Sequence, residues 1–548
     1  MRRAGQILLV VGFLLFMSGC GSQSQVATPS STSSNLSQAP VGLSLTDTPP
    51  SGVTVLFFQL SITGATLTNS TGGPPVSLLS STNPVPVNVA ALQTDIAFLG
   101  SQNVAAGTYN SLAVTFANPQ LTIFNASDSS LSSVCAVGKV CEVTPTTTSG
   151  SSLALTFCAP GFTGNPCPSN SLTSSALPVT LSASSPLAFK LDVHLDTVIQ
   201  SDLSLDLTAT NGVTISQVTP PTPGGPIPAF AKIFTGTVQT LGTNQFTLQT
   251  LEGRTFTIDV NNSTTYSDFP SSGTCTTTAE GFSCVATGDV VNVEVTLQTD
   301  GSLLATAVDF IQLPTQQTVE GNIIGLSTSG SNTIMDLVIQ KQPSSANADV
   351  LPVGKHASVT VPASLPAGSY TVDSGSFVLP TYPPALTFTS AANLQVGQTV
   401  LVVVEGTVTH PAGSGSGNPN GSAPFGAADV SFTASMISLE PSEITGTVAS
   451  VPAQGSLSFT LATMPAFFVP PSATAGKPPA MEPVIITIDT TGSTTFLPST
   501  LSPDSILGLK VNDVVSVQGW VFSTPTSTTT ITIGAESVLD RGQVSPLF

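Results

Sequence analysis

The sequence predicts a nearly all-β protein, and three observations support that fold class. Forty-four prolines and 46 glycines are spread over 548 residues and leave few stretches long enough for a helix. Val, Ile, Thr and Phe alternate with polar residues along most of the chain, as in strands with one buried face. Only 7% of residues are charged and 40% are hydrophobic, a balance that favours folded cores over disorder. The length allows three or four domains.

The first segment, residues 1–20, is predicted to be a lipoprotein signal peptide. Arg2 and Arg3 precede an apolar run at 7–17 (ILLVVGFLLFM), which is too short to span a bilayer as an ordinary helix. The following residues, 17–20 (MSGC), resemble the bacterial lipobox, in which the cysteine sulfur takes a diacylglycerol. The resemblance makes Cys20 the expected lipidation site. The alternative is an ordinary secretory signal that ends near an unrelated cysteine.

Residues 21–40 have the composition of a flexible tether. They carry no charge and little apolar surface, and random-coil scaling gives them a root-mean-square span of about 25 Å. Gly21 and Ser22 provide no aspartate retention signal after the lipidated cysteine, which favours the outer membrane or cell surface as the location. No later segment has 18 consecutive apolar residues, so membrane attachment is expected to rest on the lipid.

The charge balance argues against nucleic acid as a partner. Eleven basic and 30 acidic residues give a net charge of -19, and no cluster of Lys or Arg offsets the repulsion of phosphate backbones. No cofactor is predicted.

Six cysteines besides Cys20 form three close pairs in the sequence, which favours disulfides in an exported protein. The pairs are Cys135 with Cys141, Cys158 with Cys167, and Cys275 with Cys284. Each bond would close one loop and contribute about 2.5 kcal/mol by loop entropy. The alternative is a four-thiolate zinc site built from the first two pairs, although structural zinc usually prefers tighter spacing.

Residues 41–218 are predicted to form the first folded domain, followed by a Pro-rich linker at 219–228 (TPPTPGGPIP). The segments that carry its pattern are 41–49 (VGLSLTDTP), 53–60 (VTVLFFQL), 87–92 (VNVAAL) and 106–116 (AGTYNSLAVTF). This order of strand, T-D-x-P turn, strand and later G-x-Y strand resembles a bacterial lipoprotein family, domain of unknown function 4382. The resemblance implies an immunoglobulin-like or transthyretin-like β-sandwich at the cell surface, and it implies no particular activity.

The rest of the chain repeats one order of features, which predicts three tandem domains at 229–312, 318–441 and 442–548. In the first copy the features are TGTV (235–238), FTL (246–248), FTIDV (256–260), STTY (263–266) and GDVVNV (288–293). In the third copy they are TGTV (445–448), FTL (459–461), ITID (486–489), STTF (493–496) and NDVVSV (512–517). The second copy is looser, runs from EGNI (320–323) to VGQTVLV (396–402), and contains a long insertion.

These repeats are similar to another family, domain of unknown function 5666. Each repeat is expected to be a small β-barrel of five or six short strands. The glycine before each final Val-rich strand fits a turn that needs a positive φ.

One strand carries a weak candidate for metal binding. Alternation at 189–196 (FKLDVHLD) directs Lys190, Asp192, His194 and Asp196 to one outward face. Asp192, His194 and Asp196 would bind a divalent cation only if loops supplied more ligands. The alternative, which we favour, is a solvated face of an acidic protein. Asp202 and Asp206 flank a similar alternating strand at 201–207 and are interpreted in the same way.

Other notable side chains fit structural roles. Tyr109 and Tyr370 each follow a small-residue turn and are expected to fix a strand entry through their hydroxyls, with sugar stacking as the alternative. Trp520 is the lone tryptophan and is assigned to a core. His356 and His410 are placed in loops, and neither has the sequence neighbours of a hydrolytic motif.

The sequence therefore predicts a lipid-anchored envelope protein that is not an enzyme. Repeated domains on a tether favour binding or scaffolding, with a surface polysaccharide or another envelope protein as the partner. Two alternatives stay open. One is a carbohydrate-active enzyme that uses two acidic residues, and the other is a divalent-cation-binding surface protein.

Overall fold

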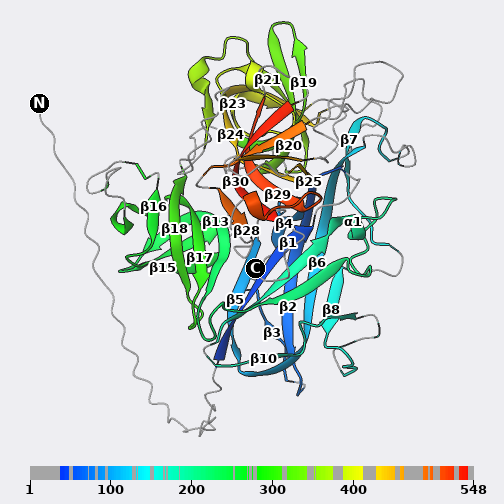
Figure 1. Ribbon diagram of the computed structural model, residues 1–548, viewed down its shortest axis with the longest axis vertical. Helices are drawn as coiled ribbons and strands as arrows, with labels where there is room; N and C mark the ends of the chain where they lie inside the picture. Colours follow the sequence, from blue (N-terminus) through cyan, green and yellow to red (C-terminus); the bar gives the residue numbers. More distant parts are fainter. Residues whose placement is uncertain are drawn as a thin grey trace, which may run out of the picture. The chain divides into compact units, whose positions relative to one another are not determined.

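The computed structural model confirms a nearly all-β protein with several sheets (Figure 1). It describes residues 38–540 except for the gaps 49–53, 72, 80–83, 93–96, 126–130, 132–133, 149–152, 165–166, 168, 170, 184, 251–253, 268, 271–274, 276–280, 312–316, 342–350, 352, 374–386, 411–427, 451–456, 462–484, 492–493, 498–505 and 524–529. The signal peptide, Cys20 and most of the tether lie outside the described residues.

The first sheet has four strands in the order β12-β11-β1-β5. These are β1 (Gln38–Thr48), β5 (Ala97–Ala105), β11 (Leu187–His194) and β12 (Val213–Val218). β1 pairs parallel with β11, and the other neighbours are antiparallel. Because Ala39 is buried in this sheet, the end of the predicted tether belongs to a strand. Asp47 also lies in β1 and not in the turn expected there.

The second sheet contains the two longest strands of the chain's described part, β2 and β6. Its main order is β3-β2-β6-β8-β9, and β4, β7 and β10 pair at its sides. The bounds are β2 (Thr54–Asn69), β3 (Val76–Ser77), β4 (Val85–Asn88), β6 (Gly107–Asn125), β7 (Lys139–Val143), β8 (Ala154–Cys158), β9 (Leu172–Thr173) and β10 (Val179–Leu181). Short helices lie between strands of the described chain. They are η1 (Val89–Ala91), α1 (Leu195–Val198), η3 (Phe282–Cys284), η5 (Ala367–Ser369), η6 (Ala391–Asn393) and η8 (Ile506–Gly508).

The two sheets share one core, which makes this part of the chain a β-sandwich. Leu43 and Leu191 of the first sheet belong to the same buried cluster as Leu60 and Val114 of the second. Side chains that alternate along these strands meet between the sheets, as expected for face-to-face packing.

Part of the outer face of the first sheet is covered, although the alternation at 189–196 predicts a solvated face. Ala188 is fully buried and Lys190 is 9% exposed. Ala188 and Phe98 join the buried cluster that contains the core of the next repeat, in which Phe98 packs 5.1 Å from the ring of Phe256. The predicted solvent exposure of Lys190 is therefore wrong, because packed side chains cover this part of the outer face.

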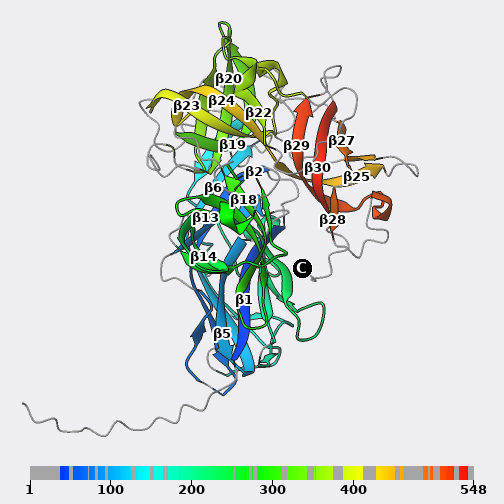
Figure 2. The same ribbon diagram turned by 90° about the vertical axis from the view of Figure 1, so that its left-hand side faces the viewer.

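Each repeat forms a six-stranded sheet with the same strand order. The first contains β13 (Ile227–Leu241), β14 (Gln245–Thr250), β15 (Thr255–Asp259), β16 (Thr265–Ser267), β17 (Val290–Leu297) and β18 (Leu303–Ile311). The second contains β19 (Thr318–Ser329), β20 (Asn332–Lys341), β21 (His356–Val361), β22 (Tyr370–Val372), β23 (Thr399–Thr409) and β24 (Val430–Glu440). The third contains β25 (Ser442–Ser450), β26 (Ser458–Leu461), β27 (Ile485–Asp489), β28 (Thr495–Leu497), β29 (Val514–Ser523) and β30 (Thr530–Asp540), seen best in Figure 2.

The pairings close five strands of each repeat into a ring. In the first repeat the order β15-β14-β13-β17-β18 is completed by a parallel pairing of β15 with β18. The second and third repeats close in the same way through β21 with β24 and β27 with β30. The sixth strand pairs parallel with the last strand of its own repeat. Each ring is thus a small barrel without a free edge between its first and last strands.

β13 begins at Ile227, inside the predicted linker. Ile227 is 2% exposed and pairs with Leu297, which draws it into the barrel. The ladder of β13 with β17 shifts between Ile227 and Ala231, so Pro228 falls where regular pairing is interrupted.

The same kind of turn precedes each of the long strands β17, β23 and β29. Gly288 and Gly397 have φ values of 96° and 92°, and Asn512 takes the same position in the third repeat with φ 75°. The positive φ that the sequence predicts is thus confirmed, with Asn in place of Gly in the third repeat. The backbone N–H groups of Gly288 and Asn512 donate to Val238 and Val448 at 2.8 and 2.9 Å, which ties each turn to the first strand of its barrel.

Trp520 lies on β29 of the third repeat but packs with the core of the second. It is 1% exposed, as its assignment to a core predicts, and it shares a buried cluster with Val402 and Ile437. Its indole Nε1 donates to the carbonyl oxygen of Asp373 at 2.8 Å. Gln398 Nε2 donates to the carbonyl oxygen of Val521 at 2.8 Å. Trp520 and Phe522, which belongs to the same buried cluster, together with these hydrogen bonds, therefore help to join the two barrels.

Candidate functional site

The predicted metal-binding face at 192–196 is only partly formed. Asp192 Oδ2 lies 3.9 Å from His194 Nε2, and their side chains are 27% and 28% exposed. β11 ends at His194, and Asp196 lies in α1, where Thr197 Oγ1 donates to its carboxylate at 3.3 Å. The prediction that Asp196 shares a strand face with Asp192 and His194 is therefore wrong, because the strand ends and a short helix begins at Leu195. Among the described residues, no group of three or more His, Cys, Asp or Glu side chains is placed to hold a metal ion.

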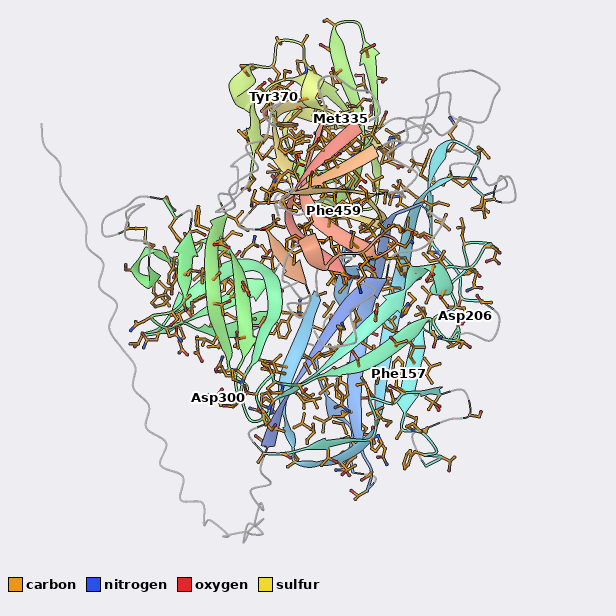
Figure 3. All side chains as sticks on the ribbon, viewed as in Figure 1. Phe157, Asp206, Asp300, Met335, Tyr370 and Phe459 are labelled. Atoms are coloured by element: carbon orange, nitrogen blue, oxygen red, sulfur yellow. A yellow bond between two sulfur atoms is a disulfide. The ribbon has the colours of Figure 1, made fainter. Side chains whose placement is uncertain are left out.

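Asp202 and Asp206 organise turns, and the strand predicted at 201–207 is wrong. Asp202 Oδ1 accepts hydrogen bonds from Ser204 Oγ at 2.7 Å and Ser204 N at 3.0 Å. Asp206, labelled in Figure 3, accepts the same pair of bonds from Thr208 at 2.6 and 3.0 Å. Short carboxylates that accept nearby backbone N–H groups stabilise turns over strands.

All three predicted disulfides are present. The Cα–Cα distances are 5.6 Å for Cys135–Cys141, 6.1 Å for Cys158–Cys167 and 5.0 Å for Cys275–Cys284. These distances lie in the ordinary range for disulfides. The first two pairs are thus used in cross-links and are not the ligands of a zinc site.

Both tyrosines are packed, in agreement with their predicted structural role. Tyr109 Oη donates to the carbonyl oxygen of Ala105 at 2.9 Å, and the residue is 2% exposed. Tyr370 packs edge-on against Phe388 with ring centroids 5.9 Å apart. Burial raises the pKa of both hydroxyls. The buried rings are not presented for sugar stacking.

The most distinctive group of side chains is a buried ionisable cluster, which we call the Glu142 cluster. It consists of Glu142, Asp336, Lys355, His356 and Asp429. Glu142 comes from β7 of the sandwich, whereas the other four come from the second barrel. His356 opens β21 and is 4% exposed, so its predicted loop position is wrong. His410 follows β23 and is exposed.

Strand pairing explains how the barrel assembles its part of the cluster. His356 pairs with Val338 of β20, which places it near Asp336 on the same strand. β21 also pairs parallel with β24, and the N–H of Asp429 donates to the carbonyl oxygen of His356 at 2.9 Å just before β24 begins. The barrel therefore holds Asp336, His356 and Asp429 by its own backbone.

Glu142 reaches this group with both carboxyl oxygens. Its Oε2 contacts the Nζ of Lys355, and its Oε1 accepts the backbone N–H of His356 at 3.1 Å. His356 Nε2 in turn lies 3.1 Å from Asp336 Oδ1. The exposed fraction is 11% for the Glu142 side chain and 5% for that of His356, against 35% for Lys355.

The environment of Glu142 favours its protonated form. Burial raises the pKa of Glu142 to about 8, and a hydrogen bond with the Asp429 side chain adds to the rise while Lys355 opposes it. A negative charge on Glu142 is costly because the carboxyl group is buried and lies beside the Asp429 carboxyl group.

Apolar and polar contacts surround the cluster. Phe57 and Val140 of the sandwich share a buried cluster with Ile324 and Val338 of the second barrel. Gly354, next to Lys355, has φ 77°, and a Cβ at this position would lie 2.6 Å from the Phe57 ring. Only glycine fits this close approach.

Three side-chain hydrogen bonds extend the same contact. Asn88 Nδ2 donates to Gln340 Oε1 at 2.7 Å, and Gln340 Nε2 donates to the carbonyl oxygen of Leu56 at 2.9 Å. Thr122 Oγ1 donates to the carbonyl oxygen of Gly354 at 2.5 Å. The polar groups buried here are thus paired across the contact.

A shallow pocket lies elsewhere on the molecule, at the sandwich end of the Pro-rich linker. Its volume is about 410 Å³, and its lining includes Pro178, Pro186, Leu187, Gln217, Pro220 and Pro223. It contains no charged side chain, so it offers no acid or base for catalysis.

Sequence reasoning did not find the Glu142 cluster. Glu142 and Lys355 are separated by 213 positions in the chain, so no spacing rule links them. The nearest local signals are the position of Glu142 directly after Cys141 and the sequence Gly-Lys-His at 354–356.

Comparison with known families matches one part of the chain. Residues 235–309 match the profile of a domain of unknown function (DUF5666), which agrees with the resemblance of the first repeat. The match covers β14 to β17 completely, the second half of β13 from Thr235 and most of β18. A search of curated proteins found no match. No helix among the described residues is long and apolar enough to cross a membrane.

Proposed function

We propose that this chain is a lipid-anchored protein of the cell envelope that binds or holds a surface component without catalysis. The partner is a polysaccharide or another envelope protein. The observation that carries this proposal is the repetition of one barrel design three times, with buried contacts that join the second barrel to the sandwich and to the third barrel. Repeated units in a joined array offer several equivalent surfaces to one extended partner.

The N-terminal features support the proposed location. The lipobox-like residues 17–20, the uncharged tether and the resemblance of the domain at 41–218 to domain of unknown function 4382 all suit an exported lipoprotein. The three disulfides suit an oxidising compartment. The absence of a retention signal at Gly21 and Ser22 favours the outer membrane.

A Cys20→Ser variant is expected to lose lipid labelling and to leave the membrane fraction, because the sulfur is the attachment atom. Metabolic labelling with a fatty acid, followed by fractionation, measures both effects. Ser22→Ala is the matched control and should remain labelled and membrane-bound. A Cys20→Ser protein that stayed in the membrane fraction would contradict the proposed anchor.

Binding is tested with purified full-length protein in detergent. We expect it to retain a surface polysaccharide on a glycan array, or to capture an envelope protein from solubilised native membranes. Protein that has been reduced and heat-unfolded serves as the control for non-specific adsorption. Empty results in both assays would argue against binding and leave a purely structural role.

The Glu142–Asp429 pair does not favour the alternative of a carbohydrate-active enzyme. The two carboxyl groups hydrogen-bond to each other, whereas glycosidase carboxylates stand about 5 Å or more apart to leave space for the sugar. Both residues are also largely buried.

A further inference from the structure

Three reactive side chains meet where the sandwich contacts the second barrel. Lys355 Nζ contacts Glu142 Oε2, and the Asp429 side chain hydrogen-bonds to the same glutamate. An amine beside a carboxyl group can form an amide bond, and a second carboxyl group next to them can accept the proton that is released.

We propose that Lys355 and Glu142 condense to an intramolecular amide bond, with Asp429 as the proton acceptor. The bond would join β7 of the sandwich covalently to the residue that precedes β21 of the second barrel. It goes beyond the proposed binding role, because it concerns how the protein is held together and not what it binds.

The step balances in atoms and charge. Lys355 begins as an ammonium, Glu142 as a carboxylic acid and Asp429 as a carboxylate. Asp429 takes one ammonium proton, and the free amine attacks the Glu142 Cδ. The tetrahedral intermediate loses its hydroxyl group together with a second nitrogen proton as water. The products are a secondary amide, one water molecule and a protonated Asp429.

The geometry around Glu142 suits this reaction. The backbone N–H of His356 donates to Glu142 Oε1 at 3.1 Å, so a donor already faces the oxygen on which negative charge develops during attack. Lys355 Nζ lies beside the other oxygen, Oε2, which is the one that leaves. The raised pKa of Glu142 keeps the carboxyl protonated near neutral pH, and a neutral acid accepts an amine more readily than a carboxylate does.

The surroundings hold the groups together and limit water. Val140, two positions before Glu142, packs in the apolar cluster with Phe57 and Val338. The Cys135–Cys141 disulfide fixes β7 immediately before Glu142. Lys355 keeps 35% of its side chain exposed, which gives the released water a route to solvent.

The test is peptide mapping of the full-length protein purified from membranes. After reduction and digestion, we expect a joined pair of peptides, one with Glu142 and one with Lys355, whose mass is lower than their sum by one water molecule. Tandem mass spectrometry should locate the bond on these two side chains. Finding both peptides separate at full mass would overturn the proposal, and a bond from Lys355 to Asp429 would overturn the assignment of its partner.

Variants distinguish a covalent bond between Lys355 and Glu142 from a simple ion pair. Lys355→Arg keeps the positive charge but cannot form the amide, so the joined peptide should disappear completely. Asp429→Asn should reduce it strongly through loss of the proton acceptor, with circular dichroism confirming that the barrel is folded. Lys341→Arg is the matched control, because Lys341 pairs with Glu320 at 3.2 Å in the same barrel and should leave the joined peptide unchanged. A joined peptide that survived Lys355→Arg would also overturn the proposal.

Discussion

Replacement of Trp520 by Ala is expected to lower the free energy of unfolding by about 3–5 kcal/mol, the usual range for removing a large buried aromatic side chain. Trp520 is 1% exposed and packs with the core of the second barrel, although it belongs to a strand of the third. The variant also leaves the carbonyl oxygen of Asp373 without the indole N–H that bonds it at 2.8 Å. Both barrels should therefore unfold at lower denaturant concentration.

Urea denaturation followed by far-ultraviolet circular dichroism measures the change, because the variant lacks the chain's single tryptophan. Trp520→Phe is the matched control. It keeps most of the apolar surface and loses the hydrogen bond, so a cost of about 1 kcal/mol is expected from that bond. An alanine variant as stable as the phenylalanine variant would show that the indole does not join the two barrels.

Glu440 is expected to make the second barrel less stable at alkaline pH. It is the last residue of β24, and no hydrogen bond reaches its Oε1 among the described residues. Burial raises the pKa of Glu440 to about 8, and the charges of Asp373 and Glu320 add to the rise. A carboxyl group with a raised pKa in the folded state contributes stability that is full below its ordinary pKa of 4.5 and is lost as pH rises to about 8.

Glu440→Gln should remove most of this pH dependence, because the amide does not ionise. The free energy of unfolding that is lost between pH 4.5 and 8 is a few kcal/mol, at about 1.4 kcal/mol per pKa unit. The glutamine variant should therefore be more stable than the parent at pH 9 and nearly equal to it at pH 5. Thermal unfolding across this range measures the effect. Glu405→Gln, at an exposed position on β23, is the control and should retain the parent's pH dependence.

The features that the sequence predicts well are those carried by local pattern. The TGTV and FTL segments of the first and third repeats become equivalent strands, and the Val-rich segments do so in all three barrels. Alternation of apolar and polar residues with period two marks these segments as strands. The disulfides follow from short spacing in the chain. The positive φ of Gly288 and Gly397 follows from the turn that each must make.

The features that the sequence does not predict depend on contacts between distant segments. Lys190 alternates like a solvated residue, yet the neighbouring Ala188 packs with the first barrel and the face is covered. Glu142 follows Cys141 in an ordinary short strand, and only tertiary packing brings it to Lys355 and His356. Periodicity reports which face of a strand is apolar, and it does not report which surface covers the other face.

The position of Trp520 and Phe522 also bears on the order in which the chain folds during synthesis. Both belong to β29, near the end of the described chain, and both are part of the core of the second barrel. The sandwich and the first barrel contain all of their own strands by residue 311. The core of the second barrel, whose last strand ends at Glu440, is completed only by Trp520 and Phe522 further along the chain. We therefore expect the nascent chain to fold the sandwich and first barrel early and to finish the second and third barrels together.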